Sequence, residues 1–248
     1  MKKLILMAAL FALTLSTVHA SAIFTGSAMG IGGTITDRIT FTYSGSNLVV
    51  VLENTSTGPT GFVADELLGA FWDNSVSGVT FTPVLAIADQ TIDHNNVVLG
   101  SNTNVGCNWA YKQAAFLGTS YGVGGAGYGN FGAGNVFGAP GCGNNGQPDG
   151  GDYGIVSSAG VVNTDGIPSI SAFILGKLTL TFTVGGAGAA QFSESSIQNV
   201  KSTWGTQPEV VTTNDGGSTQ SMPEPGTFFA LGGGLVGIAC LPRRKKLS

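Results

Sequence analysis

Charged side chains are scarce in this chain of 248 residues, of which only 10% are Asp, Glu, Lys or Arg. An average globular protein carries about 25% charged residues. Glycine, with 40 residues, takes much of the missing share. Because glycine is a poor helix former, long amphipathic helices are not expected, and the composition favours short strands and turns.

Basic residues are almost absent between residues 21 and 222. That segment holds four of them (Arg38, Lys112, Lys177 and Lys201) against thirteen acidic residues, which gives 4 − 13 = −9. A surface so poor in cations does not match phosphate groups, so nucleic acid is not expected as a partner. The other six basic residues lie at the two ends of the chain.

Histidine is also rare, since only His19 and His94 occur. His94 stands in a polar Asp-His-Asn-Asn segment, and no Gly-x-Ser-x-Gly motif accompanies it, so we interpret it as a solvated turn residue rather than the base of a triad. One histidine cannot provide the usual sets of zinc ligands. The neighbouring carboxyls of Asp65 and Glu66 are not assigned as the acid pair of a glycosidase, because adjacent residues on a strand face opposite sides. We expect this pair in a solvated loop. These shortages predict that the protein is not an enzyme.

The N-terminus has the order of features that marks a secretory signal. Lys2 and Lys3 precede an apolar run over 4–15, and Val18 and Ala20 put small side chains where signal peptidase reads them. We predict a signal helix over residues 1–20 that is removed before Ser21. The alternative is a buried N-terminal helix.

The C-terminus combines a short apolar stretch with a basic end. Pro223-Glu224-Pro225 is followed by an uncharged segment over 227–241 and then by Arg243, Arg244, Lys245 and Lys246. As a helix, 227–241 reaches about 22 Å, less than the roughly 30 Å of a bilayer's hydrocarbon layer. The basic cluster at 243–246 should stay cytoplasmic, which places the middle of the chain across the membrane. A permanent C-terminal anchor is the alternative.

Over residues 223–248 this order of motif, short glycine-containing helix and basic end resembles the PEP-CTERM sorting signal. The resemblance implies export past signal peptidase, brief anchoring in the inner membrane, processing by an exosortase, and delivery to the cell surface or an exopolysaccharide matrix. Segments 149–155 and 199–206 are similar to parts of uncharacterised PEP-CTERM ectodomains, and no function comes with that similarity.

Alternating apolar residues predict strands in the middle of the chain. They occur over 39–43 and 178–184, and the first run continues through a Ser-Gly-Ser-Asn turn into 48–52 as a hairpin. We expect an antiparallel β-sandwich ectodomain over 21–212, with a jelly-roll or a single curved sheet as alternatives. Further strands are predicted at 22–25, 69–72, 78–81, 97–99, 170–175 and 197–204.

Two segments are predicted to lie outside the strands. Residues 118–154 contain fifteen glycines, with Tyr121, Tyr128, Phe131 and Phe137 spaced among them, and we expect a long surface loop that these aromatics tie down. A self-associating aromatic-glycine patch is the alternative. Residues 213–222 are expected to form a flexible stalk before the sorting tail.

Cys107 and Cys142 are the two cysteines outside the predicted processing segments. In an oxidising compartment we expect them to form a disulfide. Closing this loop would stabilise the fold by about 3 to 4 kcal/mol and hold the base of the glycine-rich insert.

Two kinds of binding site remain open in the sequence. Asn145, Asp149 and Asp152 offer oxygen ligands for calcium, although their spacing departs from the EF-hand pattern, and a simple turn is the alternative. Trp109 and Tyr111 could stack on a sugar, with a place in the core as the alternative. The sequence therefore predicts a non-enzymatic surface or matrix protein with no obligatory cofactor. A carbohydrate-binding or calcium-dependent adhesive module comes second, and a secreted hydrolase third.

Overall fold

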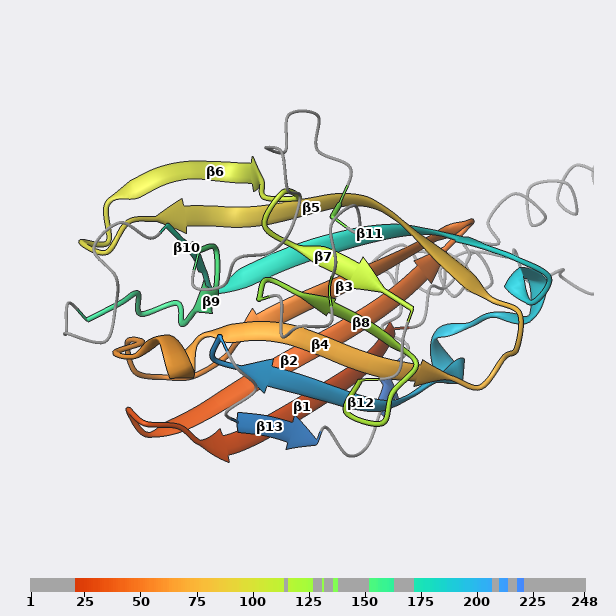
Figure 1. Ribbon diagram of the computed structural model, residues 1–248, viewed down its shortest axis with the longest axis horizontal. Helices are drawn as coiled ribbons and strands as arrows, with labels where there is room; N and C mark the ends of the chain where they lie inside the picture. The colour runs from red at the N-terminus through yellow and green to blue at the C-terminus, as the bar shows by residue number, and fades with distance from the viewer. Residues whose placement is uncertain are drawn as a thin grey trace, which may run out of the picture. The chain divides into compact units, whose positions relative to one another are not determined.

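The computed structural model describes residues 21–113, 116–126, 131, 136–137, 152–162, 172–206, 210–213 and 218–220. These belong to a compact unit, Ser21–Gln220, which is all-β (Figure 1). Its helical elements among the described residues are three 3-10 turns, at Val63–Asp65, Ala189–Gln191 and Glu194–Ser196. The strands are β1 (Ser21–Met29), β2 (Thr34–Ser44), β3 (Asn47–Asn54), β4 (Leu67–Asn74), β5 (Thr80–Ile92), β6 (Val98–Asn104), β7 (Ala110–Lys112), β8 (Tyr121–Gly124), β9 (Ile155–Val156), β10 (Phe173–Leu175), β11 (Lys177–Gly185), β12 (Ile197–Trp204), β13 (Val210–Thr213) and β14 (Ser218–Gln220).

All of these strands join one large mixed sheet, whose main order is β13-β12-β4-β9-β10-β5-β11-β3-β2-β1-β14. β6 pairs with β5, and β8 pairs with both β4 and β7. The β9–β10 pair is parallel, whereas the other strand pairs are antiparallel. The all-β prediction is therefore confirmed, while the sheet is mixed rather than purely antiparallel.

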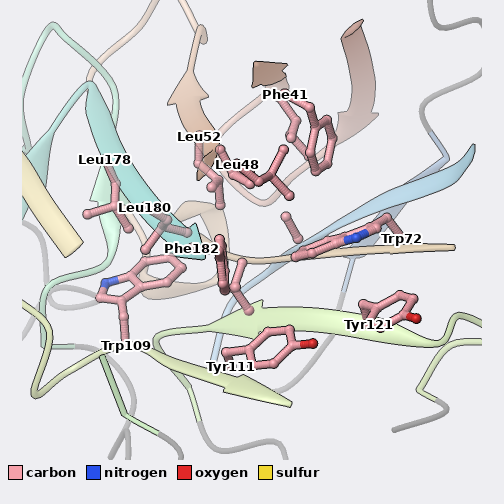
Figure 2. Close-up of a cluster of buried hydrophobic side chains, with 14 of the residues drawn as sticks. Phe41, Leu48, Leu52, Trp72, Trp109, Tyr111, Tyr121, Leu178, Leu180 and Phe182 are labelled. Atoms are coloured by element: carbon pink, nitrogen blue, oxygen red, sulfur yellow. The ribbon is translucent and has the colours of Figure 1, made fainter. Parts of the chain in front are cut away.

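The predicted alternation produces the core. In β2, β3 and β11 successive side chains point to opposite faces of the sheet. One row is buried, and the other row consists mostly of threonines and valines. The buried rows meet the aromatic side chains of β4, β7 and β8, as Figure 2 shows for Phe41, Leu48, Phe182 and Trp72. Phe41 packs edge-on against Trp72 with ring centroids 5.4 Å apart.

β5 is longer than the strand predicted at 78–81, and it includes Pro83. The register of the β5–β11 pair shifts between Thr181 and Phe182, next to the position where Phe182 pairs with Pro83. Proline lacks a backbone N–H and is tolerated in a sheet at such a bulge. Gly78, which was predicted as part of the strand, has a φ of 73° and lies in the preceding turn.

The prediction of a surface loop over 118–154 is wrong for its first part. Residues Tyr121–Gly124 form β8, a fully buried strand between β4 and β7. A Cβ on Gly122 would lie 2.2 Å from Cδ1 of Phe71, and one on Gly124 would lie 2.6 Å from Cε2 of Phe131. Here glycine is required because aromatic rings lie directly on the backbone of the strand, not because the chain needs unusual torsion angles.

The predicted stalk also contains regular structure. Residues Ser218–Gln220 form β14, which pairs antiparallel with the start of β1, and Thr213 is the last residue of β13. The predicted signal helix over 1–20 and the predicted membrane helix over 227–241 lie outside the described residues. Within the described part of the chain, no helix has the length and apolar character needed to cross a membrane.

Candidate functional site

The residues of the predicted sorting tail, Pro223, Glu224 and Pro225 with Arg243, Arg244, Lys245 and Lys246, lie outside the described residues. The functional side chains that the structure does describe are the aromatics, His94, Cys107 and the carboxyls around Asp65.

His94 lies in the tight turn between β5 and β6. The carboxylate of Asp93 accepts hydrogen bonds from the backbone N–H groups of Asn95 and Val97, each at 2.8 Å. These two bonds lower the pKa of Asp93, the bond from Val97 having the largest effect. The turn predicted for this segment is confirmed, and the Asp93 carboxylate stabilises the backbone of that turn.

Trp109 and Tyr111 are inside the core, so the expectation that they stack on a ligand at the surface is wrong. Trp109 has no exposed surface and Tyr111 is 8% exposed. Figure 2 shows both side chains pointing into the cluster that contains Phe182, whose ring centroid lies 5.2 Å from that of Tyr111. Burial raises the pKa of the Tyr111 phenol. The alternative given by the sequence, a place in the core, is the observed one.

Cys107 is disulfide-bonded. Its predicted partner, Cys142, lies outside the described residues, so the pairing of these two cysteines stays a prediction.

The predicted calcium ligands Asn145 and Asp149 also lie outside the described residues, whereas Asp152 is described and partly exposed. Within the ranges that the structure describes, no three His, Cys, Asp or Glu side chains gather as a metal-binding group. A site containing Asp152 must therefore draw on other oxygen donors.

Asp65 is buried, which contradicts the expected solvated loop. Its two carboxylate oxygens accept hydrogen bonds from the backbone N–H groups of Ile31, at 2.8 Å, and Gly32, at 2.7 Å. The carboxylate thus fixes the turn between β1 and β2. A Cβ on Gly30 would lie 2.2 Å from Oδ1 of Asp65, so the backbone can approach the carboxylate only with glycine there.

A surface pocket of about 320 Å³ opens beside Asp65. Its walls come from the β1–β2 turn and from the segment after β3, and hydroxyl groups are frequent along them. The polar side chains that line it are Thr34, Ser56, Thr57, Thr60 and Asp65. Hydroxyl and carboxylate groups of this kind can bind the hydroxyl groups of a polar ligand such as a sugar.

Glu66 is the most unusual side chain in the described part of the molecule. It has no exposed surface, and neither carboxyl oxygen has a hydrogen-bond partner. Burial and, to a smaller extent, the negative charge of Asp152 raise the pKa of Glu66 well above its usual value of 4.5. Asp65 and Glu66 contact different segments, as their adjacent positions suggested, but both are buried.

The turn at 152–154 brings backbone close to the carboxyl of Glu66. A Cβ on Gly154 would lie 2.1 Å from Oε2 of Glu66. Next to it, Tyr153 has a φ of 59°, a left-handed conformation that costs about 1 to 3 kcal/mol for a residue other than glycine. Local strain of this size persists only where surrounding contacts impose it.

Those contacts come from both sides of the turn. The indole N–H of Trp109 donates to the carbonyl of Tyr153 at 3.1 Å, and the N–H of Tyr153 donates to the carbonyl of Ala172 at 2.6 Å. Leu67 pairs with Ile155, which aligns the segment after Glu66 with the segment after the turn. Trp109 therefore positions the turn at Asp152, a role that its sequence context did not indicate.

Comparison of the chain with protein-family models, with curated proteins and with solved structures finds no match. The functional interpretation therefore depends on the sequence and on the geometry described above.

Proposed function

We propose that this chain is an exported, non-enzymatic protein of the cell surface or extracellular matrix, which an exosortase processes at the tail over 223–248. In this proposal signal peptidase removes residues 1–20, the inner membrane holds the tail briefly, and the β-domain is released toward an exopolysaccharide matrix. The primary support is the tail itself, where a Pro-Glu-Pro motif, a short apolar stretch and four basic residues follow in order.

The pairing of β1 with β14 is the structural observation that supports this proposal. Ser21, the first residue after the predicted signal, pairs with Gln220, which lies three residues before Pro223. Neighbouring strands lie about 4.8 Å apart. The segments that precede Ser21 and follow Gln220 therefore start from neighbouring strands, which suits a chain whose two ends engage the same membrane before signal peptidase acts.

The non-enzymatic part of the proposal draws on composition. After removal of 1–20, His94 is the one histidine left in the sequence. Its neighbour Asp93 is committed to the backbone of the turn. A triad or a zinc site built on His94 therefore lacks support, which ranks a secreted hydrolase below a structural protein.

The proposal includes a sandwich arrangement of the sheet. In its support, β1 lies against β12 and β13, at the opposite end of the main strand order. The buried carboxylate of Asp37 in β2 accepts hydrogen bonds from Ser202 in β12, at 2.5 Å, and Thr212 in β13, at 2.8 Å. Such contacts are expected when the two ends of a sheet curl over one core.

The test is to express the full-length chain in a bacterium with and without its exosortase, and to locate it by fractionation. We expect surface or extracellular delivery only when the exosortase is present. Glu224→Ala should hold the protein at the inner membrane, whereas Glu209→Ala, a matched change upstream of the motif, should leave delivery unchanged. Delivery of the Glu224→Ala protein to the surface would contradict the proposal.

A second function is favoured by the pocket beside Asp65, which supports a carbohydrate-binding module. Its hydroxyl-rich walls suit a glycan, and the exposed apolar side chain of Ile31 follows Gly30 in the β1–β2 turn that forms one wall. Thr57→Ala should weaken retention of the full-length protein on immobilised exopolysaccharide, while Thr82→Ala, an exposed position on β5, should not. Equal retention of both variants would remove this alternative.

A further inference from the structure

The carboxyl group of Glu66 has no partner in either of its protonation states. An ionised carboxylate needs donors or a cation, and a buried charge without them is strongly unfavourable. A neutral carboxyl still has one O–H to donate and one oxygen that accepts. Neither oxygen of Glu66 has a hydrogen bond, so protonation removes the charge but leaves the polar group unsatisfied.

Neither oxygen of Glu66 is hydrogen-bonded to a basic side chain, and three of the domain's four basic residues have partners elsewhere. Arg38 pairs with Glu53, Lys177 pairs with Asp89 at 2.8 Å, and Lys201 donates to the carbonyl of Leu117. Between residues 21 and 222 the chain has only four basic residues. A counter-charge for Glu66 is therefore more readily supplied by an ion from solution than by the chain.

A second carboxylate lies close enough to Glu66 to act on it electrostatically. Asp152 belongs to the turn whose backbone contacts Glu66 at Gly154, and it is partly exposed, so an ion could enter from its side. Two nearby carboxylates repel each other unless a cation lies between them. Taken with the unpartnered oxygens, this repulsion points to a cation.

We propose that Glu66 and Asp152 are ligands of one divalent cation, and that calcium is the ion this site selects. Calcium binds oxygen donors, takes six to eight of them, and accepts backbone carbonyls and water beside carboxylates. The two carboxylates supply only oxygen, and among the described residues no histidine or cysteine joins them as a third metal ligand that would favour zinc. The proposal goes beyond export and matrix location, and it does not depend on Asn145 or Asp149.

The surrounding structure is built to hold the turn at a fixed distance from Glu66. Gly154 lets the backbone approach the carboxyl, and the hydrogen bonds of Trp109 and Ala172 hold Tyr153 in its strained conformation. Preorganised ligands of this kind lose little conformational entropy when a metal binds. The cation would link the end of the Val63–Asp65 turn, just before β4, to the turn before β9.

Terbium luminescence on the full-length protein in mild detergent tests the site directly. Tb³⁺ occupies calcium sites. The indole of Trp109, which is hydrogen-bonded to Tyr153 next to Asp152, should sensitise the Tb³⁺ emission. We expect one bound ion per chain and displacement of Tb³⁺ by CaCl₂. Glu66→Gln and Asp152→Asn should each weaken the affinity for Ca²⁺ by about tenfold or more, which corresponds to about 1.4 kcal/mol or more.

The controls distinguish the site from general attraction to an acidic protein. Glu53→Gln and Asp89→Asn remove carboxylates of the exposed ion pairs and should leave Ca²⁺ affinity unchanged. If Glu66→Gln fails to fold, the Asp152→Asn variant, which changes a partly exposed position, still tests whether the site binds Ca²⁺. The inference is overturned if wild-type protein binds no Ca²⁺, or if both site variants bind it as tightly as wild type, in which case Glu66 is a buried acid satisfied by water. Neither result affects the export test.

Discussion

Ser21 and Gln220 face each other across the β1–β14 pair, although nearly the whole domain separates them in sequence. Because Ser21↔Gln220, Ala22↔Thr219 and Ile23↔Ser218 form one antiparallel register, the domain begins and ends at a single sheet edge. The predicted signal-peptidase cut before Ser21 thus lies at the start of a strand pair that mutation can disrupt.

Thr219→Pro should open this edge. Proline has no N–H to give to the pair and resists a place inside a strand. By hydrogen exchange we expect faster exchange of the amides in 21–23 that β14 protects, while the amides of 24–29 that bond to β2 keep their protection. Equal protection in the variant and the wild type would show that β14 does not pair with β1 in solution.

Gly122→Ala should destabilise the domain. The added methyl group would lie 2.2 Å from the ring of Phe71, which is buried and packs against Phe116 and Phe131 and therefore cannot move away freely. Overpacking of this kind costs about 1 to 3 kcal/mol in the free energy of unfolding, measurable by urea denaturation. Gly58→Ala, where a Cβ meets nothing within 4 Å, is the matched control and should be close to neutral. A stabilised Gly122→Ala variant would contradict the packing described for β8.

Asp37→Ala should cost much more than Asp89→Ala. Ser202 and Thr212 both donate to Asp37 and also contact each other, so loss of the carboxylate leaves at least one buried hydroxyl without an acceptor, at about 1 to 3 kcal/mol per unsatisfied group. Asp89 forms an exposed ion pair with Lys177, and such pairs contribute about 0 to 1 kcal/mol. Unfolding in urea compares the two directly, and equal losses would mean that Asp37 does not connect β2 to β12 and β13.

Stability in EDTA should fall as the pH rises above about 4.5, the usual pKa of Glu66. The pKa of Glu66 is raised in the folded protein, so between the unfolded and folded values the folded state holds one more proton than the unfolded state. The slope is then negative, at about 1.4 kcal/mol per pH unit, until the folded pKa is passed. Glu66→Gln should remove this decline, and added CaCl₂ should oppose it by stabilising the ionised carboxylate. A wild-type stability that rises over the same range in EDTA, with Glu66→Gln making no difference, would contradict the assignment.

The strands that carry regular alternation could be predicted from the sequence. β2, β3 and β11 contain the expected ranges because their apolar residues recur at every second position. β12 has the predicted bounds, although its apolar residues Ile197, Val200 and Trp204 do not alternate. β8 could not be predicted in this way, since glycine in a strand normally signals a loop, and the reason for Gly122 is a phenylalanine on another strand. β9 is too short to show any period, whereas β10 lies within the strand predicted at 170–175.

The candidate site was predictable only in part. Asp152 was identified by its oxygen-rich sequence, but Glu66 was not, because an adjacent acidic pair is typical of a solvated loop. The turn at 152–154, which lies against its carboxyl, is far away in the chain. Trp109 was identified as an aromatic of interest, yet its hydrogen bond to Tyr153 depends on tertiary structure that no local pattern encodes.

The most direct measurement is the intact mass of the mature protein recovered from outside the cell, with peptide mapping of both termini. Exosortase processing predicts an N-terminus at Ser21 and the loss of Arg243 through Ser248. A mature protein that still ends at Ser248 would contradict the proposed processing, and an N-terminus inside β1 would contradict the predicted signal cleavage.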